Sequence, residues 1–206
     1  MNKIKISVCI ITFDEEKNIR ACLESVKWAE EIIIVDSFSQ DKTIEICKEY
    51  TDKIYQVDWE GFGKTKNLAL SYATQPWILS LDADERVNEA LKDEILAIDQ
   101  RSDGYFIPRK SFFGGKWIKY CGWYPDYTIR LIKNGHGKFK EQKVHEAIEI
   151  KGNVVYLKCP LIHYTYKDIT DFVRRLNRYS TLSAEEKTGL SRISLFLSLL
   201  FLKKDF

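Results

Sequence analysis

Two aspartates separated by one residue, Asp82 and Asp84, directly follow the apolar run Trp77–Leu81. In extended backbone, residues i and i+2 project to the same side, so both carboxylates can face one cation. Carboxylate oxygens suit Mg²⁺ or Mn²⁺, which also bind substrate phosphate oxygens. The DxD pattern predicts a divalent-cation site that neutralises a leaving diphosphate. A solvated acidic turn is the alternative interpretation.

The first half of the chain alternates strand-like and helix-like patterns. Apolar runs cover residues 4–12, 31–35, 53–57 and 77–81, and segments with helical spacing lie between them. This alternation predicts a parallel sheet with right-handed crossovers. Ligands of such sheets bind beyond the carboxyl ends of the strands. Acidic residues follow all four predicted ends, namely Glu15, Asp36, Asp58 and the DxD pair, which predicts one acidic cleft.

The second half is less regular. Residues 104–109, 127–132 and 154–159 are expected to form strands, a Gly- and aromatic-rich loop covers 112–124, and a helix covers 169–186. The predicted fold class is therefore α/β, a mixed and mostly parallel sheet flanked by helices, with a C-terminal helical segment. Without a repeat or a linker, we expect one domain over residues 1–188 and an apolar tail over 189–206.

Composition narrows the class of protein. The 206 residues carry 32 Lys+Arg and 30 Asp+Glu, a net charge of +2 that predicts no nucleic-acid partner. Five scattered cysteines indicate buried thiols in a reducing, cytoplasmic compartment, with neither disulfides nor a zinc site. The N-terminus leaves no room for a signal peptide. The apolar run Leu190–Leu202 is too short to span a membrane.

Four ordered motifs resemble those of family 2 glycosyltransferases. They are Ser7–Ile19 (SVCIITFDEEKNI), Val35–Thr43 (VDSFSQDKT), Gly61–Asn67 (GFGKTKN) and Leu81–Glu85 (LDADE). The resemblance implies a GT-A (Rossmann-like) fold, a nucleotide-sugar donor and inversion at the anomeric carbon.

Later segments are similar to one branch of that family, which adds glucose to the inner core of lipopolysaccharide. They are Gly122–Tyr127, Arg130–Leu131 and Val144–Glu146. The similarity implies a UDP-sugar donor, UDP-glucose as the expected one, and an acceptor hydroxyl on a lipid-linked core glycan. An enzyme of this kind is expected to lie in the cytoplasm, in peripheral contact with the inner membrane.

The resemblance also assigns roles to individual positions. It implies a nucleoside pocket lined by Thr12, Phe13 and Glu15, with Asp36 accepting hydrogen bonds from the base or ribose. It further implies donor-phosphate or base-edge contacts by Lys64, Lys66 and Asn67, a ribose or metal-bound water on Asp82, and the metal itself, Mg²⁺ or Mn²⁺, on Asp84.

Inversion requires a carboxylate that takes the proton of the acceptor hydroxyl. The resemblance implies Asp126 for this role, although the family often has Glu-Asp where this chain has Pro125-Asp126; Glu146 is the second candidate. Arg130 stabilises diphosphate charge or pairs with Asp126. His145 and His163 are metal or diphosphate contacts or structural histidines, and His145 is the stronger functional candidate.

Two further features allow two interpretations each. Trp117, Trp123, Tyr124 and Tyr127 stack on sugar rings or form a plain aromatic core. The basic residues of the helix at 169–186 and the tail after it contact an anionic membrane, or the helix packs on the sheet. Two other functions fit the motifs less well: transfer to a polyprenyl phosphate, and nucleotide-sugar binding without catalysis.

Overall fold

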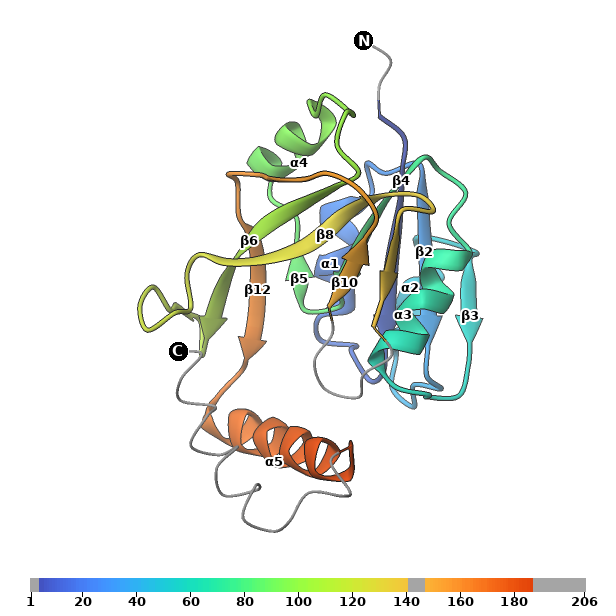
Figure 1. Ribbon diagram of the computed structural model, residues 1–206. Coiled ribbons are helices and arrows are strands. Elements are labelled where there is room, and N and C mark those ends of the chain that lie inside the picture. Colours follow the sequence, from blue (N-terminus) through green and yellow to red (C-terminus); the bar gives the residue numbers. More distant parts are fainter. Residues whose placement is uncertain (1–3, 141–146, 187–206) are drawn as a thin grey trace.

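The fold of the computed structural model is a large mixed sheet with helices on both faces, together with a small two-stranded sheet (Figure 1). The structure describes residues 4–140 and 147–186. In chain order, the first nine elements are β1 (Ile6–Thr12), α1 (Ile19–Val26), β2 (Glu31–Asp36), α2 (Thr43–Cys47), β3 (Ile54–Gln56), α3 (Phe62–Ser71), β4 (Trp77–Asp82), β5 (Glu85–Arg86) and α4 (Glu89–Leu96). The remaining elements are β6 (Gly104–Phe113), β7 (Lys116–Trp117), β8 (Asp126–Lys133), β9 (Gly137–Phe139), β10 (Ile148–Ile150), β11 (Val154–Tyr156), β12 (Leu161–Tyr166) and α5 (Ile169–Glu186).

The first four strands form the parallel half of the sheet, in the order β3-β2-β1-β4. The predicted parallel sheet is confirmed, and the four carboxyl ends meet at one edge. β8 runs antiparallel to both β4 and β6, and β12 and β11 continue the sheet on the other side of β6. β9 and β10 form a separate two-stranded sheet. The strand β5, just past the DxD motif, pairs with β12.

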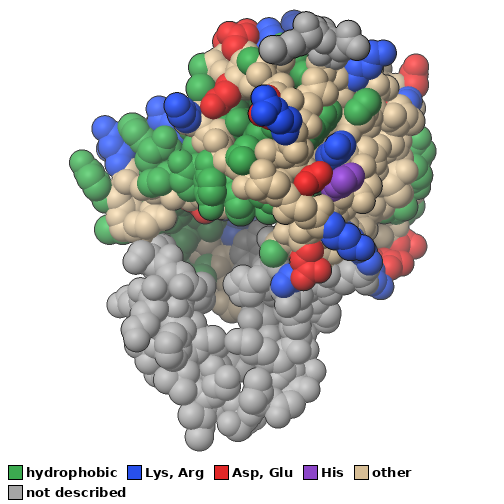
Figure 2. Space-filling view, turned by 45° about the horizontal axis from the view of Figure 1, so that its top comes forward, with side chains coloured by type: hydrophobic (Ala, Val, Ile, Leu, Met, Phe, Trp, Pro, Cys, Tyr) green, Lys and Arg blue, Asp and Glu red, His purple; other side chains and the backbone are tan. Residues whose placement is uncertain are grey.

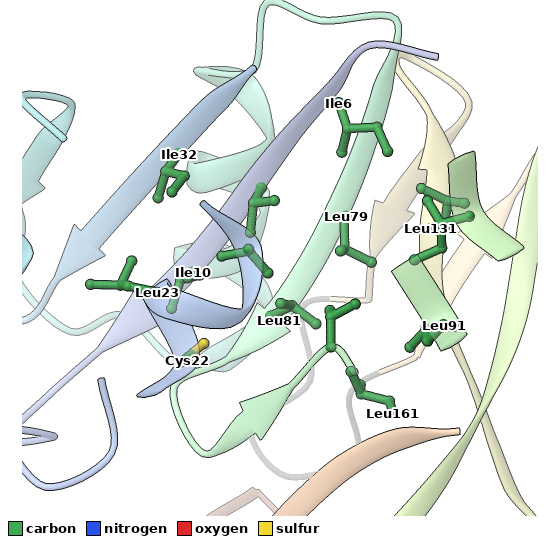
Figure 3. Close-up of a cluster of buried hydrophobic side chains, with 14 of the residues drawn as sticks. Ile6, Ile10, Cys22, Leu23, Ile32, Leu79, Leu81, Leu91, Leu131 and Leu161 are labelled. Atoms are coloured by element: carbon green, nitrogen blue, oxygen red, sulfur yellow. The ribbon is translucent and has the colours of Figure 1, made fainter. Parts of the chain in front are cut away.

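Two apolar clusters hold the helices on the sheet. On one face, Ile10, Leu79 and Leu81 pack with side chains of α1, α2 and α4 (Figure 3). On the other face, α3 covers Cys9, Ile33 and further residues. Because β1, β2 and β4 are covered on both faces, they are apolar along nearly their whole length. This rigid layer fixes the strand ends that carry the acids.

Several sequence-based expectations need correction. The strand expected at 154–159 ends early, since β11 covers only Val154–Tyr156 and the next strand, β12, begins at Leu161. The loop expected at 112–124 contains the end of β6 and all of β7. The predicted Gly61–Gly63 loop is in fact the start of α3, whose first helical residue is Phe62. Helix α4 was not anticipated; Asn88 caps it by accepting the amide hydrogen of Leu91.

The cysteines partly follow the expectation. All five are free; Cys9, Cys22 and Cys47 are buried, whereas Cys121 is exposed, which corrects the prediction of uniformly buried thiols. Within the described ranges, no helix combines the length and apolarity that crossing a membrane requires. The tail at 189–206 lies outside the described residues.

Asn67 links α3 to the small sheet. Its Nδ2 donates to the carbonyl oxygen of Phe139 at 2.9 Å, and its Oδ1 accepts the Phe139 amide hydrogen at 2.7 Å. We predict that Asn67→Ala lowers the free energy of unfolding by about 1–3 kcal/mol, because two backbone groups lose their partner. Urea unfolding measures this loss. Ser71→Ala, which removes an exposed hydroxyl bond within α3, is the matched control and should change little.

Candidate active site

A large cavity opens at the carboxyl edge of the parallel strands. Its volume is about 1270 Å³. The strand-end residues that line it include Thr12, Phe13, Glu15, Ser37, Asp82 and Asp84. The far wall comes from β6, β8, β12 and α5 and includes Arg109, Arg130, His163, Arg174 and Arg175. Asp58 is exposed and, like Asp36, does not line the cavity, so acids from two of the four predicted strand ends reach it.

Asp82 is held by two cations. Its Oδ1 lies 2.7 Å from Lys66 Nζ, and its Oδ2 accepts a hydrogen bond of 2.5 Å from Arg130 Nη2. Burial alone would raise the pKa of Asp82, but the charges of Arg130 and Lys66 outweigh it and hold that pKa far below its ordinary value. Asp82 therefore stays ionised and is largely committed to protein partners.

Glu85 extends this arrangement into a chain of alternating charges. It is fully buried, and its Oε1 accepts a hydrogen bond of 2.6 Å from Arg130 Nη2. Arg109 Nη1 lies 4.0 Å from the same oxygen. Arg109 then binds Asp126 Oδ2 through Nε at 2.8 Å and Nη2 at 2.5 Å. We call Lys66, Asp82, Arg130, Glu85, Arg109 and Asp126 the charge chain.

The charge chain shows which carboxylates Arg130 pairs with. The possibility that Arg130 pairs with Asp126 is wrong, because Arg109 fills that position and Arg130 turns to Asp82 and Glu85. A register shift explains the direction of Arg130. Tyr105 pairs with Leu131 and Phe106 with Ile129, which makes Arg130 an extra residue in β8. Such bulges re-aim a side chain.

Asp84 is the second acid of the DxD motif and faces the cavity. His163 Nε2 lies 3.6 Å from its Oδ1, and Arg175 Nη1 lies 3.6 Å from its Oδ2. Two ligands of one Mg²⁺ ion lie about 3 to 4 Å apart, so Asp84 and His163 fit a shared cation. Ser111 Oγ lies 3.1 Å from His163 Nδ1, and this hydrogen bond orients the ring.

The described residues bring no third His, Cys, Asp or Glu into a metal-binding group with this pair. That number of protein ligands suits Mg²⁺ or Mn²⁺, which take much of their coordination from phosphate oxygens and water. The role of His163 as a metal contact, beside Asp84, stays a prediction. His145, the stronger candidate from the sequence, and Glu146 lie outside the described residues.

Asp36 has a different environment from the one expected. It is fully buried and outside the cavity lining. Its carboxylate accepts hydrogen bonds from Thr12 Oγ1 at 2.9 Å, from the Ser39 amide at 2.9 Å, from Ser39 Oγ, and from Gln56 at 3.2 Å. A base or ribose contact would have to exchange one of these bonds.

The rest of the Val35–Thr43 motif also bonds to the loop after β1. The amide of Asp14 donates to Ser39 Oγ, that of Glu15 to Thr43 Oγ1, and that of Glu16 to Asp41. The polar motif residues thus hold two strand-end loops together.

Glu15 lines the cavity near Asp84. Burial raises the pKa of the Glu15 carboxyl, a hydrogen bond from Asn18 lowers it, and the negative charge of Asp84 raises it further.

The three polar residues predicted from Gly61–Asn67 differ in position. Lys66 is buried in the charge chain, whereas Lys64 is exposed and pairs with Glu60 at 3.1 Å. Neither Lys64 nor Asn67 lines the cavity. Among the four aromatic residues proposed for sugar stacking, only Tyr127 lines it. Trp117 instead packs edge-on against Tyr124, and Trp123 against Tyr166.

Sequence reasoning missed Glu85, Arg109 and the inward direction of Arg175. Glu85 directly follows the DxD motif, and this adjacency could have drawn attention to it. Arg109 carries no such signal, because only the pairing of β6 with β8 brings it opposite Asp126. Arg175 belongs to the basic set of α5, but it faces Asp84 and Asp171, not a membrane.

Solved structures show which fold the chain has. The chain resembles the crystal structure of S. aureus TarS residues 1–349, with a TM-score of 0.61 and 21% identity over 93% of this chain and 68% of that one. It matches the complex of the same protein with UDP-GlcNAc equally well, with a TM-score of 0.61 and 69% of that chain covered. The fold is the GT-A fold of glycosyltransferases.

The family follows from the sequence. The model described as "Glycosyl transferase family 2" matches residues 7–163. LpsC of Rhizobium meliloti (strain 1021), a lipopolysaccharide core biosynthesis glycosyltransferase, is 32% identical over 97% of this chain and 77% of its own length. An uncharacterized glycosyltransferase of Rickettsia felis is 40% identical over 88% of this chain and 70% of its own length. The chain belongs to glycosyltransferase family 2.

The charge chain yields a stability prediction. We predict that Arg130→Met lowers the free energy of unfolding at neutral pH by about 3–5 kcal/mol, because it leaves the buried Glu85 and Asp82 short of a cation. Urea unfolding at several pH values measures it. The low pKa of Asp82 stabilises the fold above the ordinary carboxylate pKa, and this stabilisation fades as the pH falls below it. The difference between variant and wild type should therefore shrink in acid.

The matched control removes an arginine from an exposed ion pair. Arg20 binds Glu49 through two bonds, with both side chains half exposed. Arg20→Met should scarcely change stability, because water screens that pair. If both variants lost the same free energy of unfolding, the charge chain would have no special role in stability.

Proposed function

We propose that this enzyme transfers glucose, with inversion, from UDP-glucose to a hydroxyl group of a lipopolysaccharide-core or similar glycan acceptor. The observation that carries the proposal is the position of Asp84. It faces a large cavity at the carboxyl edge of a parallel sheet, with His163 and Arg175 each 3.6 Å from one of its oxygens. One carboxylate, one imidazole and one guanidinium can together bind a cation with its diphosphate.

The donor is expected to lie along the strand ends. Phe13 is 46% exposed and lines the cavity, so its ring offers a flat face to a nucleobase. Asp36 and the residues bonded to it keep the two loops beneath the nucleoside in a fixed shape. A uridine nucleotide is favoured by the likeness to a protein solved with UDP-GlcNAc. Glucose is favoured by the branch motifs alone, whereas the lipopolysaccharide core is favoured by those motifs and by the relative LpsC.

Asp84 and His163 would hold the divalent cation, with Asp82 reaching a metal-bound water. When bound, the cation offsets the negative charge that develops on the leaving diphosphate. Arg175 would also help to offset the negative charge on the leaving diphosphate. The guanidinium pairs with Asp84 and Asp171 in the present structure, and it can turn to the diphosphate once the carboxylate is engaged by a cation. Arg174 also lines the cavity beside it.

Asp126 would act as the base on the acceptor hydroxyl. Both Arg109 bonds are to Oδ2, so Oδ1 takes no part in this pair. Arg109 fixes the plane of the carboxylate while leaving one oxygen for a proton. Asp126 does not itself line the cavity, but its neighbours Arg109 and Tyr127 do. Because the side chain is 38% exposed at the start of β8, a bulky glycan can approach it. Inversion follows from a single in-line attack on the face opposite the diphosphate.

Ligand binding tests the donor. We predict that UDP and UDP-glucose raise the thermal unfolding midpoint more with Mn²⁺ than without it, and more than GDP-mannose does. A ligand at 100-fold its dissociation constant stabilises the fold by about 2.7 kcal/mol. Thermal shift with UDP-glucose, UDP-galactose, GDP-mannose and UDP measures this. Asp84→Asn should fold normally and lose the Mn²⁺-dependent part. If no uridine nucleotide shifts the midpoint, the donor assignment is wrong.

Transfer kinetics test the base. We predict that Asp126→Asn slows sugar transfer to a core-oligosaccharide acceptor by about 10²-fold or more, since the proton acceptor is lost, while UDP binding stays near normal. Asp58→Asn, at a strand end outside the cavity, is the control and should transfer at the wild-type rate. Fast transfer by Asp126→Asn would move the base to Glu146.

The same measurements separate the rival functions. A polyprenyl-phosphate acceptor is already anionic and needs no base, so transfer to it would tolerate Asp126→Asn. A module that binds nucleotide sugars without catalysis would respond to UDP in the thermal assay and release no product from UDP-glucose.

A further inference from the structure

A basic and aromatic hairpin projects from the sheet beside the cavity. It covers residues 110–120, the end of β6, β7 and the residues that follow, and we call it the basic hairpin. It carries Lys110, Lys116 and Lys119, and no Asp or Glu occurs from Lys110 to Pro125. β6 leads to it at the left of Figure 1, and blue and green side chains gather at the left end of the molecule in Figure 2.

The lysine charges are concentrated and not neutralised. Lys110 Nζ lies 4.2 Å and Lys119 Nζ 4.7 Å from the centre of the Trp117 ring. Within residues 4–140 and 147–186, none of the three lysines has a carboxylate partner. By contrast Lys27, Lys64 and Lys92 each pair with a glutamate. Cation–π contact gives the Lys110 and Lys119 ammonium groups about 0.5–1 kcal/mol each at an exposed site but does not neutralise their charge.

The basic hairpin is firmly supported but is not part of the donor site. Phe113 packs on Tyr166 and Phe172 with ring centroids 5.7 and 5.9 Å apart, and the Gly114 amide donates to the Tyr166 carbonyl oxygen at 2.9 Å. None of residues 110–120 lines the cavity, although Tyr166 does. The hairpin therefore borders the cavity as a separate surface held in a fixed position.

We propose that the basic hairpin docks the enzyme on an anionic phospholipid membrane. Three unneutralised lysines match a surface of lipid phosphates, and tyrosine and tryptophan favour the membrane–water interface. Tyr120, which is 78% exposed, stands next to Lys119 and is free to enter that interface. Soluble glycans offer no extended negative plane for three separate ammonium groups. The inference is independent of the donor and acceptor in the proposed function.

Docking at this point would bring the cavity to a membrane-bound substrate. Because Phe113 contacts Tyr166 at the cavity wall, a glycolipid held in the same membrane lies close to the cavity opening. Each lysine near an anionic surface contributes about fivefold in partitioning, so three contribute on the order of 100-fold.

Vesicle binding of the whole chain tests the proposal. The probes are vesicles of phosphatidylcholine alone and vesicles that contain about one quarter phosphatidylglycerol, a typical anionic leaflet. In co-sedimentation, we expect wild type to bind the anionic vesicles, and high salt to release it. The triple variant Lys110→Gln, Lys116→Gln, Lys119→Gln should bind them on the order of 100-fold more weakly. Its thermal midpoint and its response to UDP should match those of wild type.

The matched control removes the same charge from elsewhere. Lys5, Lys48 and Lys158 are exposed and lie outside the basic hairpin, and replacing all three by Gln should leave vesicle binding near the wild-type level. The proposal is overturned if the hairpin variant still binds, which would assign binding to another segment. It is overturned equally if both triple variants lose binding alike, which would indicate net charge alone. Since no nucleotide sugar enters the assay, its outcome is separate from that of the donor tests.

Discussion

The pairing of buried charges is the constraint on which the site depends. The fully buried Glu85 and the half-buried Asp82 lie within a four-residue segment around Asp84, where cationic partners stabilise ionised carboxylates. Lys66 comes from α3, Arg130 from β8 and Arg109 from β6. The charge chain therefore ties the DxD segment to both halves of the sheet. It also links the segment expected to face the diphosphate with Asp126, the candidate base.

Two kinds of motif residue emerge from this arrangement. Asp84 and Phe13 line the cavity, where a ligand can reach them. Asp36, Ser39 and Thr43 instead form hydrogen bonds that join neighbouring loops. Both kinds belong to family 2 motifs. A motif residue can thus shape the cavity through its hydrogen bonds, because loops that carry few apolar contacts must be held by such bonds. The base or ribose contact of Asp36 stays a prediction.

Arg175 gives the cavity an internal counter-charge. Its distance of 3.6 Å from Asp84 equals that of His163, so the carboxylate is balanced by a guanidinium when no cation is bound. A guanidinium can serve a carboxylate or a phosphate with similar geometry. The helix α5 can thereby exchange one anionic partner for another as the cavity is filled. The interpretation of the basic helix and the apolar tail as a membrane contact stays a prediction.

By itself the sequence determined the parallel half of the sheet, the position of the DxD motif at a strand end and membership in a glycosyltransferase family. These follow from local apolar periodicity and from short ordered motifs, which need no knowledge of distant residues. Only the tertiary structure decided that Arg109, not Arg130, holds Asp126, that Asn67 bonds to Phe139, and that Asp36 is buried beneath the loops. The reason is physical. Antiparallel pairing of β6 with β8 and the bulge at Arg130 set which side chains meet, and no spacing along the chain encodes a register between strands so far apart.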